Sequence, residues 1–232
     1  MGSGTLITFP VLLACGLPAV TANVSNNVGL VPGSLSAVIG YRAELRGQRG
    51  RVLRLASASF LGAAAGAVLL LVLPSSAFDT IVPALIALGV LLVVVGPAIS
   101  RRVAARAEAR GGMPDHGVWW VWPAVLGAGV YGGYFGAAQG VLLMAILGIG
   151  VADTMQRHNA TKNALSLVVN AVAAVVFLFV AHLDWRAVAL IAVGSVIGGQ
   201  IGSTVGRRLP PGVLRGVIVV VGVVAIVSLL LR

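Results

Sequence analysis

The sequence predicts an all-α protein, a polytopic membrane helix bundle built from two inverted-topology repeats. Three observations lead to this prediction. Of the 232 residues, 59% are hydrophobic and 9% are charged, whereas a soluble domain carries roughly 25% charged residues. The apolar residues form long runs separated by proline, glycine and arginine. One pattern of glycine, proline and asparagine also returns 136 residues further on, the separation of Asn23 from Asn159.

The charge balance indicates contact with a lipid bilayer rather than with nucleic acid. The formal net charge is +10, but the arginines stand in short runs between apolar stretches, with no basic face that carries interleaved aromatic residues. Short basic runs beside apolar segments are typical of membrane topology signals. The single cysteine, Cys15, allows no intrachain disulfide and has no metal-ligand company. We therefore expect the bilayer as a partner, and no nucleic acid, metal or cofactor.

A spanning helix needs about 20 apolar residues, and several stretches reach that length. They cover residues 23–41, 54–73, 79–99, 118–136, 159–181, 187–206 and 212–231. Two shorter apolar stretches, 5–16 and 140–151, are bounded by glycines and by the breaks "LPAVTAN" and "VADTMQRHN". Because both are short for a span, we expect thin, tilted or broken helices there.

An internal repeat relates the first third of the chain to its second half. The matches at the 136-residue offset are Gly4 with Gly140, Asn23 with Asn159, Asn27 with Asn163, Gly62 with Gly198, Gly66 with Gly202 and Pro74 with Pro210. The sharpest agreement is a motif of the form N-x-[ST]-x-N, which reads "NVSNN" at 23–27 and "NATKN" at 159–163. Asparagine is rare in this chain, so its agreement at one offset argues against chance.

The repeat divides the chain into three parts. Residues 1–100 form a first transmembrane repeat, residues 101–117 a basic cytoplasmic linker, and residues 118–232 a second transmembrane repeat. The second copy has a helix at 118–136 before its short segment, whereas the first copy starts at the short segment. We therefore expect the first repeat to lack its first helix, either because the start site is misassigned or because the protein dispenses with it.

The arginines predict that the two copies are inverted. Residues 41–54 carry five arginines and one glutamate, whereas the equivalent "HLDWR" has almost no excess charge. Conversely "SSAFD", after Pro74, has no arginine, whereas its equivalent "RRLPPGVLR" has three. Positive loops stay in the cytoplasm. The loops at Arg46 and Arg207 are therefore expected inside the cell and Ser75 and Asp184 outside, in a multi-pass protein of the plasma (cell inner) membrane.

Regularly spaced glycines predict close helix packing. Gly62 and Gly66 form one pair, and a longer series follows at Gly194, Gly198, Gly202 and Gly206. A spacing of four places the members of each series on one helix face, where two backbones can approach each other in lipid.

A polar stripe follows the second copy of the motif. If a helix begins at Asn159, then Lys162, Asn163 and Asn170 lie along one face, together with Ser166, and leucine, valine and alanine fill the rest. Lys162 is the only lysine in the chain. Lysine at the centre of a membrane helix costs roughly 2.5–3.5 kcal/mol, so such residues face a cavity or a partner.

These residues are the candidate substrate site. Both motifs follow a break, and asparagine is a favoured N-cap, so we expect both helices to begin at or inside the membrane. Helix N-termini favour anions, and inverted copies are expected to bring the two ends together. The candidate ligands of an anion are Asn23, Ser25, Asn27, Asn159, Thr161, Lys162, Asn163 and Asn170.

Other readings of these residues stay open. The asparagines can hydrogen-bond across helices without any substrate, and N-x-[ST] is also a glycosylation sequon. His158 can couple protons near neutral pH, although a histidine at a helix start is more often a cap or interface residue. Asp153 and Arg157 are expected to pair with each other on the cytoplasmic side.

The two halves resemble a known family of membrane permeases. The stretch "GAGVYGGYFGAAQGVLLMAILGIG" followed by "RHNATKNALSLVVNAVAAVVF" is similar to the second conserved half of the sulfite exporter TauE/SafE family, and "GSGTLITFPVLLACGLPAVTANVSNNVGL" resembles its first half. The resemblance implies a multi-pass carrier of sulfur-containing anions such as sulfite, sulfonates or sulfoacetate. Where the family has a glycine-rich run after its "GGxFG", this chain has Ala137, Ala138, Gln139 and Gly140.

The leading functional hypothesis is a secondary transporter of a small anion that works by alternating access between the two copies, with protons as the first guess for the coupling ion. A membrane-embedded enzyme is a weaker alternative, because the apolar segments hold no HExxH, no paired carboxylates and no Ser/His/Asp set. A non-transporting membrane scaffold is the third. A homo-oligomer is compatible with all three hypotheses.

Overall fold

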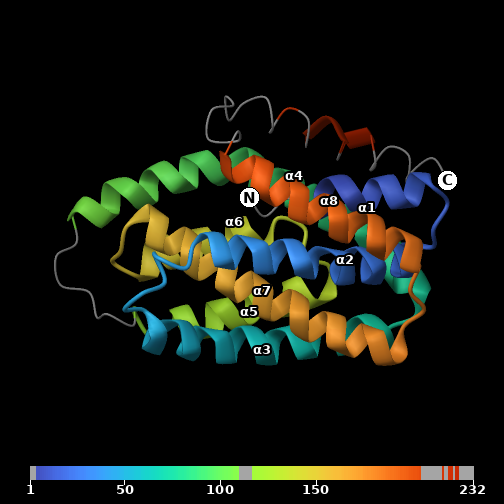
Figure 1. Ribbon diagram of the computed structural model, residues 1–232, viewed down its shortest axis with the longest axis horizontal. Coiled ribbons are helices and arrows are strands. Elements are labelled where there is room, and N and C mark those ends of the chain that lie inside the picture. The colour runs from blue at the N-terminus through green and yellow to red at the C-terminus, as the bar shows by residue number, and fades with distance from the viewer. Residues whose placement is uncertain (1–3, 110–116, 205–215, 217–218, 222, 225–232) are drawn as a thin grey trace.

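A computed structural model of the chain is a bundle of helices (Figure 1). It describes residues 4–109 and 117–204, together with 216, 219–221, 223 and 224. Within these residues all regular structure is helical, so the predicted all-α class is confirmed. The helices are α1 (Thr5–Ala14), α2 (Ala19–Gly40), α3 (Arg49–Val72), α4 (Ser75–Ala109), α5 (Val121–Tyr134), α6 (Gln139–Gly150), α7 (Met155–Val180) and α8 (Trp185–Thr204).

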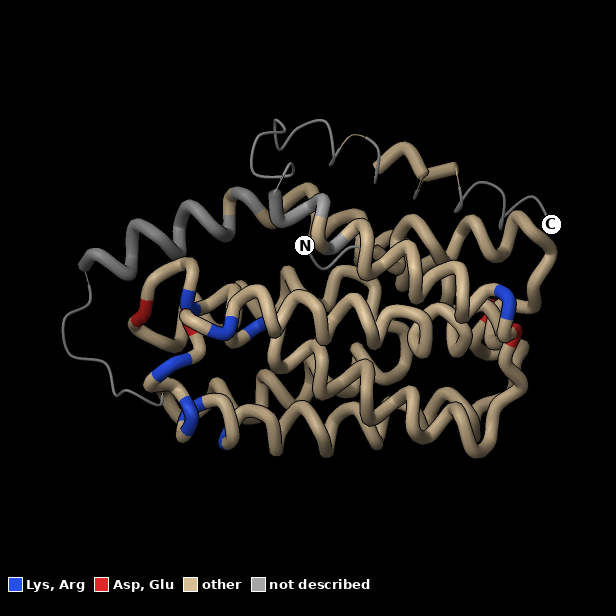
Figure 2. The backbone as a smooth tube through the Cα atoms, in the orientation of Figure 1, with Lys and Arg blue, Asp and Glu red and all other residues tan. Residues whose placement is uncertain are grey.

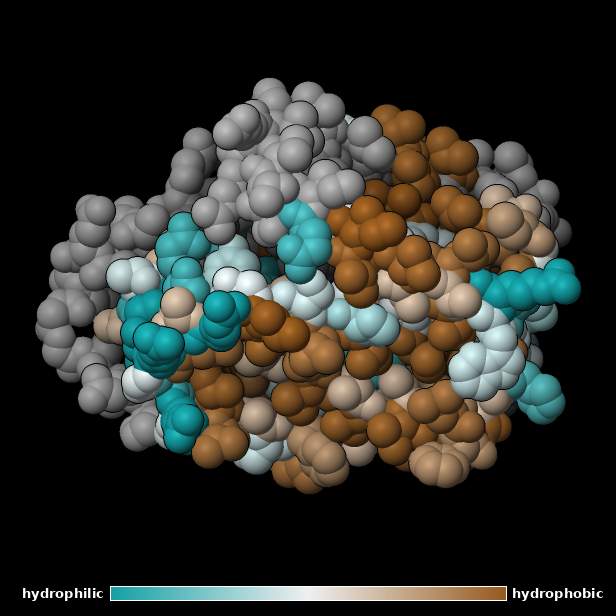
Figure 3. Space-filling view, viewed as in Figure 1, coloured by the Kyte–Doolittle hydropathy of each residue, from teal (hydrophilic) through white to brown (hydrophobic). Residues whose placement is uncertain are grey.

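The surface of the bundle suits a bilayer. Three described helices are long and apolar enough to cross a membrane, namely α3, the part Ser75–Gly96 of α4, and α7. Large apolar side chains such as Leu53, Val72 and Phe179 are exposed. Apolar atoms cover much of the face in Figure 3, and hydrophilic atoms gather toward its two ends. Lipid is the solvent that accommodates such a surface.

The helix boundaries differ from the predicted ones in two places. Helix α5 has 14 residues, fewer than the predicted 118–136, because the chain turns at Phe135. Helix α4 has 35 residues and ends at Ala109, so the predicted linker 101–117 begins as a continuation of a helix. The predicted helix 212–231 and the loop at Arg207 lie outside the described residues, apart from a few positions.

Helices α5 and α6 form a hairpin that turns inside the bundle. Its turn, residues 135–138, contains two positive φ angles, 76° at Gly136 and 59° at Ala138. The Gln139 side chain, at the start of α6, donates from Nε2 to the Ala128 carbonyl oxygen at 3.0 Å, and the Tyr131 hydroxyl donates to the Ala137 carbonyl oxygen. Lipid offers no replacement for these bonds, so the turn depends on its own side chains.

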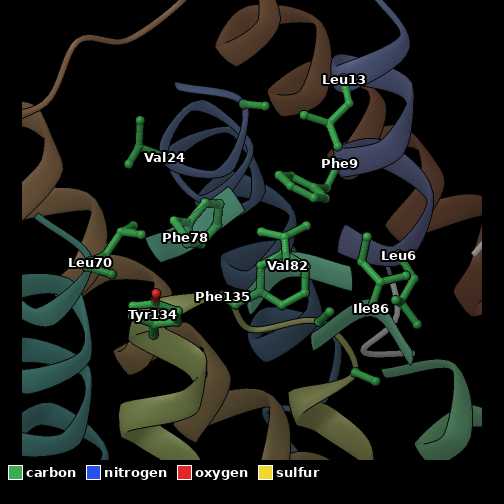
Figure 4. Packing of buried hydrophobic residues seen from close by; sticks show 14 of the residues in the cluster. Leu6, Phe9, Leu13, Val24, Leu70, Phe78, Val82, Ile86, Tyr134 and Phe135 are labelled. Carbon is green, nitrogen blue, oxygen red and sulfur yellow. The ribbon is translucent and has the colours of Figure 1, made fainter. Parts of the chain in front are cut away.

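The start of α1 meets this turn on the surface of α4. A Cβ atom built on Gly89 would lie 2.8 Å from Leu6 and 3.4 Å from the Cβ of Ala137. Phe9 packs edge-on against Phe135 with ring centroids 5.1 Å apart, and both rings join Phe78 and Tyr134 in one cluster (Figure 4). The two short apolar segments of the sequence thus both begin inside the bundle, near one point of α4.

Glycines bring α3 and α5 into backbone contact. A Cβ on Gly62 would lie 2.3 Å from the Leu126 carbonyl oxygen, and one on Gly66 would lie 2.1 Å from the Val130 carbonyl oxygen. Neither carbonyl can rotate away, since each belongs to the α5 backbone. The close packing predicted for Gly62 and Gly66 is therefore confirmed.

The glycine series predicted on α8 does not form such a contact in the described residues. A Cβ on Gly194 or Gly198 would meet no described atom within 4 Å. The surroundings of Gly202 and Gly206 lie outside the described residues. Helix α8 instead presents larger side chains to glycines of α2. A Cβ on Gly29 would lie 2.7 Å from that of Ile191. The small residues at this contact belong to the partner helix.

Helices α2 and α7 run antiparallel through the middle of the bundle (Figure 1). At one end, Arg157 at the start of α7 donates to the carbonyl oxygen of Arg46, which follows α2. At the centre the Asn170 amide donates to the Ser34 hydroxyl at 2.9 Å. The start of α2 therefore lies near the end of α7, and the end of α2 lies near the start of α7.

The α3–α5 contact yields the first prediction. Gly66→Ala places a methyl group against the Val130 carbonyl oxygen, and such overpacking typically costs about 1–3 kcal/mol. We expect a lower melting temperature in detergent and a loss of monodispersity in size-exclusion chromatography. The matched control is Gly127→Ala on α5, where a Cβ meets no described atom within 4 Å. An unchanged melting temperature for Gly66→Ala would show that the two backbones do not touch.

Candidate functional site

A cluster of buried polar side chains lies near the start of α2. Asn23, Ser25, Asn26 and Asn27 are all at most 8% exposed. Asn23 donates from Nδ2 to the carbonyl oxygen of Tyr134, the last residue of α5, at 2.9 Å. The Asn26 amide is hydrogen-bonded to the hydroxyl groups of Thr5 and Thr8 on α1. The first copy of the motif thus holds α1 and the end of α5 against α2.

Asn27 differs from its neighbours. Its Oδ1 atom is buried and accepts no hydrogen bond from the described residues. It lies four residues after Asn23, so both side chains stand on one face of α2, the face that meets the end of α5. Buried polar atoms in native proteins usually have a partner, which makes this amide a candidate for contact with a ligand.

The second copy of the motif lies in α7 and is only partly buried. Thr161 and Lys162 are 1% and 4% exposed, whereas Asn159, Asn163 and Asn170 are half-buried. Thr161 donates to the Gln48 side chain at 3.0 Å. Asn170, eleven positions after Asn159, reaches the centre of the bundle and bonds Ser34.

The sequence predicted that the asparagines cap the two helices, and this prediction is wrong. Helix α7 begins at Met155, and the Thr154 hydroxyl accepts from the Arg157 N–H as its N-cap. Helix α2 begins at Ala19 after Pro18. Each motif therefore begins in the second turn, where backbone N–H groups already bond within the helix. Thr154 is the N-cap of α7, a position that threonine favours. Pro18 stands directly before α2, and proline is common at helix starts.

The two copies of the motif also do not meet. Because α2 and α7 run antiparallel, Asn23 lies toward one end of the bundle and Asn159 toward the other, on either side of the Ser34–Asn170 bond. Eleven residues of α-helix span about 16 Å, so the motifs lie far apart along the helices. The helix starts that do approach one another are those of α1 and α6.

Charges gather at the end of the bundle where α7 begins (Figure 2). We call this the arginine-rich end. Asp153 accepts from the Arg51 guanidinium at 2.5 Å and from Arg157 at 2.8 Å. Arg51 also donates to Gln48 at 3.1 Å. The predicted Asp153–Arg157 pair is therefore confirmed, and Arg51 is the partner that the sequence reasoning missed.

Two opposing effects act on Asp153, which lies between α6 and α7. Burial raises its pKa, but hydrogen bonds from Arg51, Arg157 and the Thr154 N–H outweigh burial and hold the pKa below its ordinary value. The carboxylate is therefore charged at neutral pH and joins the start of α3 to the start of α7.

The opposite end carries a second link between distant parts of the chain. The Ser25 hydroxyl accepts from the backbone N–H of Asp184, which follows α7, at 2.9 Å. The Asp184 carboxylate in turn accepts from the Ala187 N–H and caps α8. Sequence reasoning missed Gln48 and Asp184 as partners, although they occupy equivalent positions at the 136-residue offset, and that agreement was the available signal.

No group of three or more His, Cys, Asp or Glu side chains that could hold a metal ion occurs among the described residues. The buried polar side chains of the described interior are amides, hydroxyls, one arginine, one lysine and one histidine. Such groups donate hydrogen bonds to an anion.

Comparison with known proteins points to membrane transport. The family model described as "Sulfite exporter TauE/SafE" matches residues 1–229. A curated relative from Sinorhizobium sp, "Probable membrane transporter protein ORF9", is 26% identical over 239 residues, which cover 99% of this chain and 85% of that protein. No solved structure matches the chain.

The charge network yields the second prediction. Asp153→Asn leaves Arg51 without a counter-charge, and breaking a buried pair in this way costs about 3 kcal/mol. Because the pKa of Asp153 is lowered in the folded protein, its contribution is present above the unfolded pKa, roughly 3.9, and is lost as the pH falls through the folded value. We expect a lower melting temperature at pH 7 and a difference from wild type that shrinks in acid.

The control for this measurement is Asp79→Asn, which removes an exposed carboxylate at the start of α4. Its melting temperature should follow that of the wild type at every pH. Equal melting temperatures for Asp153→Asn and wild type at pH 7 would contradict the stabilising role of the network.

Proposed function

The chain belongs to the sulfite exporter TauE/SafE family of membrane transporters, and we propose that it is a secondary transporter of a small sulfur-containing anion such as sulfite or a sulfonate. Under this proposal it is a multi-pass protein of the plasma (cell inner) membrane and a carrier rather than an enzyme. Its partners are the anion and the bilayer, not nucleic acid, and self-association is compatible with this role. The arginine-rich end faces the cytoplasm.

The observation that carries the proposal is the set of buried polar groups along α2 and α7. The Asn27 amide makes no hydrogen bond to the described residues, and Lys162 is 4% exposed. Polar groups at such depth in a membrane protein mark ion and substrate pathways. Asn27 follows Asn26, which bonds Thr5 and Thr8 at the start of α1, and the first N–H groups of a helix favour negative charge. We infer that the anion moves along the seam between α2 and α7.

Alternating access between two inverted repeats is supported by the helix boundaries. At the offset of 136 residues, Ala19 at the start of α2 falls on Met155 at the start of α7. Arg49 at the start of α3 falls in the same way on Trp185 at the start of α8. Equal spacing of two helix starts is what a structural repeat requires.

The long-range hydrogen bonds support the same proposal. If a two-fold rotation exchanges the copies, every contact between two residues implies a second contact between their equivalents. The Ser25–Asp184 bond requires one between Thr161 and Gln48, and that bond is present at 3.0 Å. Ser34 and Asn170 are each other's equivalents, 136 residues apart. Their bond therefore lies on the proposed axis.

These paired bonds act as two latches in the proposal. Gln48 and Thr161 hold α7 to the start of α3 at the arginine-rich end. Ser25 and Asp184 hold α2 to the start of α8 at the opposite end. Breaking one latch while keeping the other opens the seam on one side only, which is the requirement of alternating access.

The site yields the third prediction. Asn27→Ala and Lys162→Ala should each weaken uptake of labelled sulfite into proteoliposomes at least about tenfold, because a charge-assisted hydrogen bond to an anion contributes roughly 1.5–3 kcal/mol. Lys162→Arg should restore part of the uptake, since a planar fork replaces a point charge. Asn23→Ala should lower stability as well as uptake, because Asn23 holds the backbone of α5. Asn159→Ala should lower uptake alone.

The control for uptake is Thr80→Ala, an exposed position on α4 whose hydroxyl bonds only its own helix. Each variant is passed through size-exclusion chromatography before reconstitution. Normal uptake by both Asn27→Ala and Lys162→Ala, in monodisperse protein, would move the substrate away from this seam.

The latches yield the fourth prediction. Thr161→Val removes the hydroxyl that binds Gln48, so amide hydrogen exchange in residues 41–48 should rise while residues 181–184 stay protected. Ser25→Ala should do the reverse. A lost hydrogen bond of about 1 kcal/mol corresponds to a roughly fivefold change in local opening. If either variant raises exchange at both ends equally, the two latches do not work separately.

A further inference from the structure

A buried histidine at the arginine-rich end has no role in the contacts described above. His158 lies in the first turns of α7 and is 1% exposed. Within the described residues neither Nδ1 nor Nε2 makes a hydrogen bond. The Val151 carbonyl approaches the ring without completing one. An imidazole always carries at least one N–H donor, so this side chain leaves a buried donor unsatisfied.

Most neighbours of His158 do not share this deficiency, with Glu44 Oε2 as the exception. Arg51, Asp153 and Arg157 are joined to one another, and Gln48 and Thr161 are bonded at the same end. An unsatisfied buried polar group costs free energy, and leucine or phenylalanine would fill the space without that cost. An imidazole that is unsatisfied at both ring nitrogens beside this network indicates a partner that comes and goes.

The charges around His158 define what that partner is. Asp153, from the α6–α7 link, and Arg51, from α3, act on the ring electrostatically. On its own helix, Arg157 precedes it and Lys162 lies one turn further on. Helices α5 and α6 bring no charged residue, nor does α2. Within the α2–α3 loop, Glu44 is half-buried and the arginines are exposed.

This setting links a proton to an anion. The nearby cations, Arg51, Arg157 and Lys162, outnumber the carboxylates Asp153 and Glu44, so a proton added to His158 increases an excess of positive charge. An anion bound close by offsets that excess. By linkage, the anion then raises the affinity of His158 for the proton, and the proton raises the affinity for the anion by the same factor.

We propose that His158 is a proton-binding site that couples the transport of the anion to a proton. The inference rests on the proposed transport function. One proton joins the neutral imidazole when the anion binds and leaves it when the anion departs, so a monoanion crosses together with one proton and no net charge moves. Histidine suits this task because its charge changes near physiological pH.

The probe for the test is radiolabelled methanesulfonate in proteoliposomes. A sulfonate stays ionised throughout the working pH range, so any pH effect belongs to the protein. Two assays are run on the same vesicles. Counterflow, with equal pH on both sides, reports anion exchange alone. Accumulation driven by an imposed pH gradient reports coupling to the proton.

We expect His158→Gln to lose gradient-driven accumulation by about tenfold or more, a typical coupling factor, while counterflow stays close to wild type. The matched control is His182→Gln, which removes an exposed histidine between α7 and α8 and should leave both assays unchanged. Gradient-driven accumulation by His158→Gln at the wild-type level would overturn the proposal.

A second measurement does not depend on the variant folding. Wild-type protein in detergent is titrated with methanesulfonate by calorimetry in buffers of different ionisation enthalpy, which reports protons taken up with the anion. Uptake near neutral pH supports the proposal, and binding without proton uptake overturns it. If the wild type shows counterflow but a pH gradient does not drive accumulation, the coupling is wrong and the transport function stands. If no anion, sulfite included, shows counterflow, the transport function is wrong as well.

Discussion

Lipid removes the two forces that hold most soluble proteins together, and the structure depends on how the chain replaces them. Hydrocarbon tails neither push apolar helices together nor hydrogen-bond to exposed backbone. The chain therefore uses glycine where two backbones must touch, as Gly62 and Gly66 do between α3 and α5. It uses a small number of polar side chains where distant segments must be joined, as Ser34 and Asn170 do at the centre.

The sequence predicted the parts of the fold that follow from local pattern. Composition and apolar run length were enough for an all-α membrane bundle, and the break-bounded stretches 5–16 and 140–151 did become short helices. The Asp153–Arg157 pair was predictable because four residues of helix bring the two side chains together. The backbone contact of Gly62 and Gly66 followed from their spacing.

What the sequence did not predict depends on how segments meet in space. The local sequence does not indicate that Arg51 lies beside Asp153, about a hundred residues away. It also does not indicate that Gly194 would meet no described neighbour. The cap positions were misplaced because threonine and proline compete with asparagine for helix starts. The two motifs were expected to meet because inversion was considered without the antiparallel course of α2 and α7, which separates their starts. The choice of candidate ligands stays a prediction.

Taken together, the interior is arranged along a single direction. The described polar groups follow α2 and α7 from Asn27, through Ser34 and Asn170, to Lys162 and then to the charge network around Asp153. His158 lies between the last two. The groups that tie helices together have protein partners. Asn27 Oδ1 and both ring nitrogens of His158 lack one among the described residues, as do Glu44 Oε2 and the hydroxyl oxygens of Ser59 and Tyr134.

The length of α4 has a mechanical consequence. Its 35 residues span about 52 Å, roughly 20 Å more than the hydrocarbon core of a bilayer, so the helix overshoots the membrane or lies strongly tilted in it. The start of the connection between the two halves is therefore helical and not a slack tether, with Gly96 and Pro97 as a place where the helix can bend. A change of ten degrees in the tilt of a straight overhang of about 20 Å would move its end by about 3.5 Å. A tilt of α4 would thus move its end at the membrane surface further than the part that packs against α1 and α6.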